Sequence, residues 1–192
     1  MLKKIIAMLM ILNLYAFGAE KVAVGLNIND TDLEVDAKAS LSVLTNSFGY
    51  DNYYFTINWM NDKESFVSPG FYVENLLRGS SNFIFGFGIK SVFTKHENLK
   101  FSATPFMISA KVRLIPRNFP PAYISANWIY APSQLVFQDA KKYLEYRIEF
   151  NARVIENIEL YAGHRSLNTE YKAEDKDILY NRSLYAGFRF LF

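Results

Sequence analysis

The strongest constraint on the fold of this chain is a strict alternation of apolar and polar residues. In Asp32–Leu41 every odd position is apolar and every even position is polar, and Phe83–Lys90, Phe106–Leu114 and Leu144–Val154 keep the same period. A strand turns successive side chains to opposite faces, whereas a helix would repeat at every third or fourth residue. β-Branched and aromatic residues dominate the apolar faces, as strands prefer. The sequence therefore predicts an all-β fold.

Ten strands, with eight or twelve as alternatives, account for this pattern. Their predicted ranges are 21–29, 32–43, 50–60, 70–77, 82–93, 103–115, 122–131, 142–155, 158–167 and 182–192. The third, fifth, seventh and ninth connections are mostly longer and more polar than the others, at 61–69, 94–102, 132–141 and 168–181. Long and short connections in alternation are typical of outer-membrane barrels. The 132–141 connection is expected to fold over the mouth of the barrel as a short helix, as a binding loop or a plug.

The first residues are typical of a secretory signal peptide. A basic start at Lys3 and Lys4 is followed by a short apolar run and by small residues, with cleavage predicted after Gly18. A spanning helix needs about 20 apolar residues, more than this run provides. The sequence therefore predicts a signal peptide at 1–18 and a barrel at 19–192.

Charge and composition exclude several classes of function. Removal of residues 1–18 lowers the number of Lys and Arg from 21 to 19, against 19 Asp and Glu. A formally neutral chain has no basic surface that would bind nucleic acid. The sequence holds no cysteine and two histidines, so it predicts no disulfide, no metal site and no cofactor.

Alternation alone leaves open which face of the sheet is outside. A soluble antiparallel barrel also alternates, with its apolar face inward, so a soluble periplasmic binding barrel is one alternative. In a transmembrane barrel the polar faces line a lumen, where charges of both signs pair because an unpaired buried charge is costly. The predicted lumen charge network is Glu34, Asp36, Lys38, Glu74, Lys90, Lys111, Arg113, Glu145, Arg147, Glu149, Arg153, Glu159, Arg165 and Arg189.

The C-terminus favours the transmembrane alternative. Tyr185, Gly187, Phe190 and Phe192 resemble, position for position, the signal by which bacterial outer-membrane barrels are recognised for assembly. The resemblance implies a location in the bacterial outer membrane, contact with its lipid, and periplasmic chaperones and the barrel-assembly machinery as partners. Taken with the alternation, it predicts a transmembrane antiparallel up-and-down β-barrel.

The second half of the chain resembles the YfaZ-like outer-membrane proteins of Gram-negative bacteria. The resemblance is strongest from about 120 to 192, and it depends on Tyr130–Ser133, Phe137, Asp139, Tyr143–Arg147, Tyr161–Arg165 and Thr169–Tyr171. Earlier in the chain only Phe87–Lys90 and Val92–Thr94 are similar to the family. The resemblance implies a small barrel without an established activity. The family tends to have an aromatic residue where this chain has His164.

One pair of residues suggests chemistry. His164 and Ser166 fall on the same strand face, within the reach that a serine and its base require. The pair resembles the His-x-Ser arrangement of outer-membrane lipid A deacylases, except that Leu167 stands where an Asn is expected. A lipid-facing hydrolase using His164 and Ser166 is therefore an alternative function, with these two as the candidate catalytic residues.

The expected width of the lumen determines which class of function the sequence predicts. Barrels of about eight strands are filled by side chains, and open channels usually need about sixteen. Ten strands with many long charged residues inward predict a narrow, largely occluded lumen. The expected function is non-enzymatic: envelope structure, surface interaction, or a narrow pore for small solutes, with no ligand identified.

Overall fold

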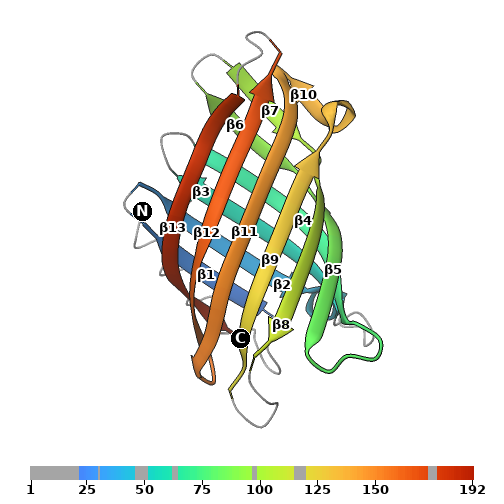
Figure 1. The fold of residues 1–192 in the computed structure, drawn as a ribbon, viewed down its shortest axis with the longest axis vertical. Helices are drawn as coiled ribbons and strands as arrows, with labels where there is room; N and C mark the ends of the chain where they lie inside the picture. Colours follow the sequence, from blue (N-terminus) through green and yellow to red (C-terminus); the bar gives the residue numbers. More distant parts are fainter. Residues whose placement is uncertain are drawn as a thin grey trace.

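Ten strands form one closed antiparallel barrel in a computed structural model of the chain (Figure 1). The structure describes residues 22–29, 31–45, 52–61, 65–96, 99–114, 120–172 and 177–192. The predicted signal peptide at 1–18 lies outside the described residues. No helix among the described residues is long and apolar enough to cross a membrane.

The barrel strands follow one another in chain order around the ring, which closes where the first strand pairs with the last. They are β1 (Val22–Ile28), β2 (Leu33–Ser40), β3 (Tyr53–Asn61), β4 (Ser65–Leu76), β5 (Phe83–Lys90), β8 (Phe106–Arg113), β9 (Ala122–Ala131), β11 (Ala140–Ile155), β12 (Ile158–Tyr171) and β13 (Asp177–Leu191). The closing register pairs Ala23 with Leu191 and Ile28 with Ala186. The predicted ten-stranded up-and-down barrel is confirmed.

The outer face of the wall is apolar, and this fixes the orientation of the alternating pattern. Large hydrophobic side chains such as Phe87, Trp128 and Phe150 point outward and are 47%, 48% and 49% exposed. Most of the residues that alternate with them along the strands point inward and are polar, charged or small, as Glu149 and Asn151 are on either side of Phe150. This is the arrangement of a transmembrane barrel, which meets lipid with its apolar face, and the reverse of a soluble barrel.

Several predicted connections are shorter than expected, because the strands extend through them. β4 begins at Ser65, β12 continues to Tyr171, and β13 begins at Asp177. The predicted 94–102 connection is the tip of a hairpin formed by β6 (Val92–His96) and β7 (Leu99–Ala103). In the other direction, the predicted strand 32–43 ends at Ser40 and is followed by the short helix α2 (Leu41–Thr45).

The 132–141 segment is one turn of 3-10 helix followed by a strand. η1 (Ser133–Leu135) leads into β10 (Val136–Gln138), which pairs with β7. Gln138 has a φ of 68°, the left-handed conformation that reverses the chain into β11. The expected short helix is therefore limited to three residues, and most of the segment's remainder extends a three-stranded sheet of β6, β7 and β10.

This three-stranded sheet begins at a break in two strands and stays joined to the barrel wall, because β6 pairs with β4 at Phe93 and Val67. β5 and β6 are separated by Ser91, and β7 and β8 by Thr104 and Pro105. Proline has no N–H for the ladder, so pairing changes partner here. The Thr104 N–H donates to the Leu135 carbonyl at 2.8 Å, and the Ser91 N–H donates to the Pro69 carbonyl at 2.7 Å. Above the break β7 pairs with β10, whereas below it β8 pairs with β9.

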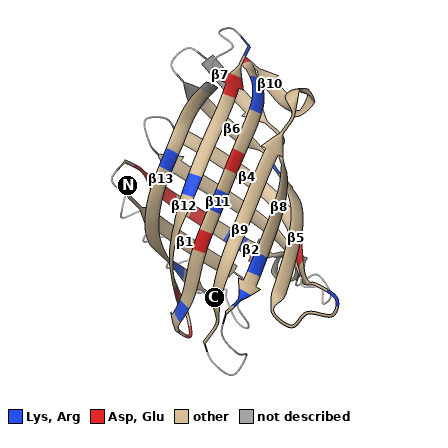
Figure 2. Cartoon of the chain, in the orientation of Figure 1, with Lys and Arg blue, Asp and Glu red and all other residues tan. Residues whose placement is uncertain are grey.

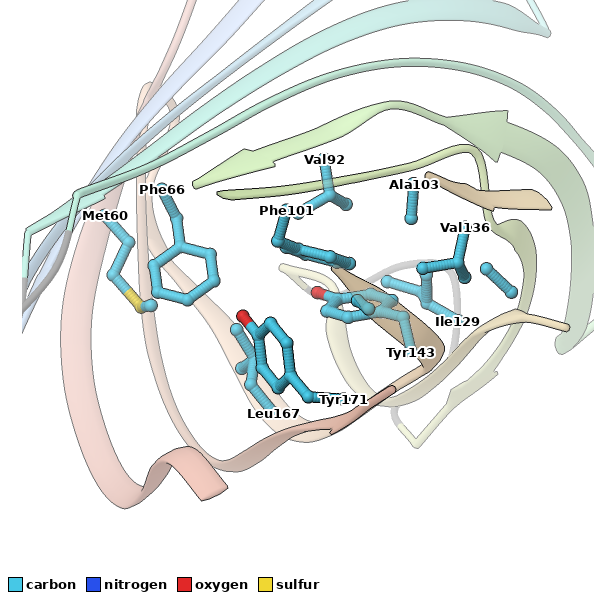
Figure 3. Packing of buried hydrophobic residues seen from close by; sticks show 12 residues of the cluster. Met60, Phe66, Val92, Phe101, Ala103, Ile129, Val136, Tyr143, Leu167 and Tyr171 are labelled. Carbon is cyan, nitrogen blue, oxygen red and sulfur yellow. The ribbon is translucent and has the colours of Figure 1, made fainter. Parts of the chain in front are cut away.

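The space between this sheet and the opposite wall is filled by buried apolar side chains (Figure 3). Phe101 and Tyr143 face each other there with ring centroids 5.4 Å apart, and Phe66 meets Tyr180 edge-on at 4.9 Å. We call this group the apolar cluster; it consists of Met60, Phe66, Val92, Phe101, Ala103, Ile129, Ala131, Val136, Ala140, Tyr143, Leu167 and Tyr171. It fills the end of the barrel that carries the longer connections.

Candidate functional site

A belt of ion pairs crosses the lumen next to the apolar cluster. Arg165 on β12 contacts Asp32 at 2.5 Å between Nη2 and Oδ1, and its Nη1 contacts Glu34. Arg147 on β11 contacts the other oxygen of Glu34 at 2.6 Å and Glu145 at 2.7 Å. Lys90 from β5 completes the chain with a 2.7 Å contact to Glu145. These six residues, Asp32, Glu34, Lys90, Glu145, Arg147 and Arg165, are called the ion belt.

Neutral side chains satisfy the belt's remaining hydrogen-bonding groups. The amides of Asn27 and Asn58 both donate to Glu34, the former at 2.8 Å. Asn181 accepts from Arg165 Nε at 3.0 Å and donates to Asp32 at 2.8 Å. The Tyr143 hydroxyl donates to Glu145 at 2.8 Å, which joins the belt to the apolar cluster.

The charged groups of the ion belt need these ion pairs and hydrogen bonds because they are buried. The side chains of Arg165, Glu34 and Asp32 are 0% exposed. Removing such charges from water is costly unless each is paired and hydrogen-bonded. Three acids and three bases balance in the ion belt, so its formal charge is zero. Together the ion belt and the apolar cluster fill the half of the lumen nearer the longer connections.

The other half of the lumen contains a polar chamber of about 360 Å³. Its lining reaches from Glu145 and Arg147 of the ion belt to Ala23 and Leu191, which lie at the ends of β1 and β13. The chamber therefore extends to the end of the barrel that carries the short turns. Asn, Ser and Thr side chains and charges of both signs line most of it. Figure 2 shows acidic and basic positions on the same strands of the barrel wall.

Two ion-pair clusters lie within the chamber. On one wall Lys38 and Lys111 contact opposite oxygens of Glu74, at 3.0 Å and 2.7 Å. On another wall Arg189 lies 2.7 Å from Glu159 and 3.5 Å from Asp36.

Aromatic rings support both clusters. Lys38 Nζ lies 3.7 Å from the centroid of the Tyr54 ring, and the Arg189 guanidinium lies 4.7 Å from that of Tyr161. The Tyr185 hydroxyl donates to Glu149 at 2.6 Å. The rings of Tyr54 and Tyr161 hold the two cations in place on the wall of the chamber.

The structure places the predicted lumen charges on the inner face, in two groups. Glu34, Lys90, Glu145, Arg147 and Arg165 belong to the ion belt, and the others belong to the chamber or its rim: Asp36, Lys38, Glu74, Lys111, Arg113, Glu149, Arg153, Glu159 and Arg189. Arg113 lies over the ring of Tyr123, which lines the chamber. Sequence reasoning missed Asp32, although its even position in the alternating segment points it inward.

The predicted assembly signal has defined places in the folded barrel. Tyr185 points inward and is 4% exposed, and Phe190 packs between Phe188 and Phe192 on the last strand. Gly187 lies directly opposite Tyr161 across β12 and β13, and a Cβ added to it would lie 2.4 Å from the Leu26 carbonyl oxygen. The glycine therefore allows the neighbouring backbone to approach closely. Whether these residues also guide assembly stays a prediction.

His164 and Ser166 do not form a catalytic pair in the structure. The His164 ring stacks on Tyr146, with centroids 5.7 Å apart. Ser166 is 7% exposed, and among the described residues no hydrogen bond joins it to His164. Leu167, which departs from the deacylase pattern, belongs to the apolar cluster. A stacked histidine on the outer face is an ordinary interfacial aromatic contact.

Comparison with known proteins adds a likeness of architecture. No protein-family model and no curated protein sequence matches this chain. One similar solved structure is a KdgM porin, which superposes with a TM-score of 0.42 and 6% sequence identity over 89% of this chain and 98% of that chain.

Proposed function

We propose that this protein is a non-enzymatic barrel of the bacterial outer membrane whose lumen is closed, and that it serves envelope structure or surface interaction. The observation that carries the proposal is the ion belt. Arg165 and Glu34 are fully buried at the centre of the lumen, and every belt charge has a partner of opposite sign. An ion crossing the barrel would have to break these contacts and then pass the apolar cluster, where a charge is strongly disfavoured.

The test is the single-channel conductance of the purified chain in a planar bilayer. We expect no reproducible conductance steps from protein whose folding is verified by its heat-dependent gel mobility. Regular steps from folded protein would overturn the closed lumen. The absence of conductance is informative only for folded protein, so the gel assay is run on each sample.

A narrow pore is the second candidate, because the chamber already opens half of the lumen. In that case the ion belt would be the selectivity filter. Replacing Arg147 by alanine would then make the pore more selective for cations, because it removes a positive charge from the narrowest part of the pathway. The reversal potential in a salt gradient measures this change. A closed structural barrel gives no current with or without Arg147.

The assignment to a YfaZ-like family is a finer proposal that rests on the sequence motifs. These motifs contain residues that fill the lumen: Tyr143, Glu145 and Arg147 lie on β11, and Arg165 and Tyr171 lie on β12. We infer that the residues which this chain shares with the YfaZ-like family include those that fill the interior of the barrel. A YfaZ-like protein of known structure with an open lumen would contradict this inference. Export by residues 1–18 and assembly by periplasmic chaperones and the barrel-assembly machinery belong to the same proposal.

A further inference from the structure

The Lys38–Glu74–Lys111 cluster differs from the other ion pairs in the lumen. Two ammonium groups contact one carboxylate, at 3.0 Å and 2.7 Å, so the cluster keeps one formal positive charge. By contrast, the ion belt is neutral and Arg189 contacts two acids. Each lysine has three N–H donors, and among the described residues both lysines donate a hydrogen bond to the Glu74 carboxylate.

The space in the chamber lies beside this surplus charge. The Lys38 and Lys111 side chains are 24% and 27% exposed, and both line the chamber. Gly86 lies directly opposite Glu74 on β5, and Ser109 lies opposite Gly86 on β8. Ser109 lines the chamber, whereas Gly86 packs so closely against it that an added Cβ would lie 2.2 Å from the Ser109 Oγ. A volume of about 360 Å³ is within the usual range of small-molecule sites, roughly 300–1,000 Å³.

Lys38 is held in a fixed position. Its ammonium lies 3.7 Å from the Tyr54 ring centroid and 5.2 Å from that of Tyr72, and these two rings stack on each other with centroids 5.2 Å apart. Glu74 anchors it from the other side. A pre-positioned cation loses little side-chain entropy when it binds an anion.

We propose that the chamber binds a small anion, a phosphate or carboxylate group, between Lys38 and Lys111. Such a ligand would neutralise the cluster's surplus charge through charge-assisted hydrogen bonds from both ammonium groups. Thr56, Ser68 and Ser109, which also line the chamber, supply neutral hydroxyl donors. This site goes beyond the proposed structural function, and it does not depend on whether the lumen conducts.

Isothermal titration tests the site. The full chain, purified from membranes in a neutral detergent, is titrated with inorganic phosphate and separately with acetate at constant ionic strength. We expect saturable binding of at least one of these anions. Lys38→Gln and Lys111→Gln should each weaken binding about tenfold or more, because a hydrogen bond to a charged group is lost. Lys111→Arg should retain most of the affinity because it keeps the charge.

Two further variants separate the site from general effects of charge. Lys142→Gln removes a positive charge from an exposed position on β11 outside the chamber, and it should leave binding unchanged. Ser109→Leu fills the chamber without changing its charge and should abolish binding. Heat-dependent gel mobility verifies that each variant is folded. The proposal is overturned if folded wild-type protein binds neither anion, or if Lys38→Gln and Lys111→Gln bind as tightly as Lys142→Gln.

Discussion

Arg165 on β12 and Asp32 at the turn between β1 and β2 are 133 residues apart in the sequence, and they meet at 2.5 Å with both side chains fully buried. The contact joins the β1–β2 hairpin to β12, which is separated from β1 by β13 alone in the ring. Glu34 binds the same guanidinium with one carboxylate oxygen and Arg147 with the other, so it links the two arginines. The interior of this barrel is thus organised by long-range ion pairs.

Removal of Arg165 should strongly destabilise the barrel. Arg165→Ala leaves Asp32 buried without its cationic partner and Glu34 with Arg147 alone, and breaking a buried pair in this way typically costs about 3–5 kcal/mol. The free energy of unfolding, measured by urea titration in detergent, should fall by that amount. Arg182→Ala is the matched control, because Arg182 is exposed on β13, and it should change stability by less than about 0.5 kcal/mol. Equal effects of the two substitutions would contradict the role given to the ion belt.

The inward glycines of β12 and β13 should tolerate no larger side chain. A Cβ at Gly163 would lie 2.5 Å from the Ile148 carbonyl oxygen, and one at Gly187 would lie 2.4 Å from that of Leu26. Because backbone atoms cannot give way easily, Gly163→Ala and Gly187→Ala should each cost about 1–3 kcal/mol.

Refolded protein in detergent is the material for this measurement, since no assembly machinery is then present. Ala162→Ser, on the exposed outer face of β12, is the control and should be close to neutral. Wild-type stability of refolded Gly187→Ala would contradict the close backbone approach as the reason for this glycine.

The sequence predicts the barrel because one residue in two is apolar and points outward over most of each strand. Phe83, Phe85, Phe87 and Ile89 alternate with inward positions in this way along β5. At the end of the barrel with the longer connections, the inward residues are apolar as well. Val92 and Phe93 on β6 are both apolar, although the first is buried and the second is 50% exposed. Where both faces are apolar the alternation disappears, so the pattern predicts one strand over 82–93 and does not show the break at Ser91 between β5 and β6.

The candidate site was predictable only in part, for a related reason. Alternation tells which face of a strand a charge occupies, and it placed Glu34, Arg147 and Arg165 in the lumen. It carries no information on their height along the barrel axis or on pairing between distant strands. The sharing of Glu74 by Lys38 and Lys111 follows from the register of β2, β4 and β8 across the closed ring. That register is a property of the folded chain.

A charge on the outer face should cost free energy according to its depth. Ile148 lies in the middle of β11 and is 53% exposed, whereas Ile155 lies at the strand end and is 59% exposed. In lipid vesicles, Ile148→Arg should lower the free energy of unfolding by about 2–4 kcal/mol and Ile155→Arg by about 0–1 kcal/mol. Equal costs at the two positions would contradict a membrane-spanning orientation of β11.

The apolar cluster should contribute stability separately from the ion belt. Phe101 is 1% exposed and packs on Tyr143, so Phe101→Ala should cost about 3–5 kcal/mol through the cavity that it leaves. Phe93 lies on the neighbouring strand of the same three-stranded sheet and points outward, so Phe93→Ala should have a much smaller effect in detergent. Urea titration measures both. Because the ion belt stays in place, Phe101→Ala should remain silent in the planar bilayer, and a conductance gained by this substitution alone would show that the apolar cluster is what closes the lumen.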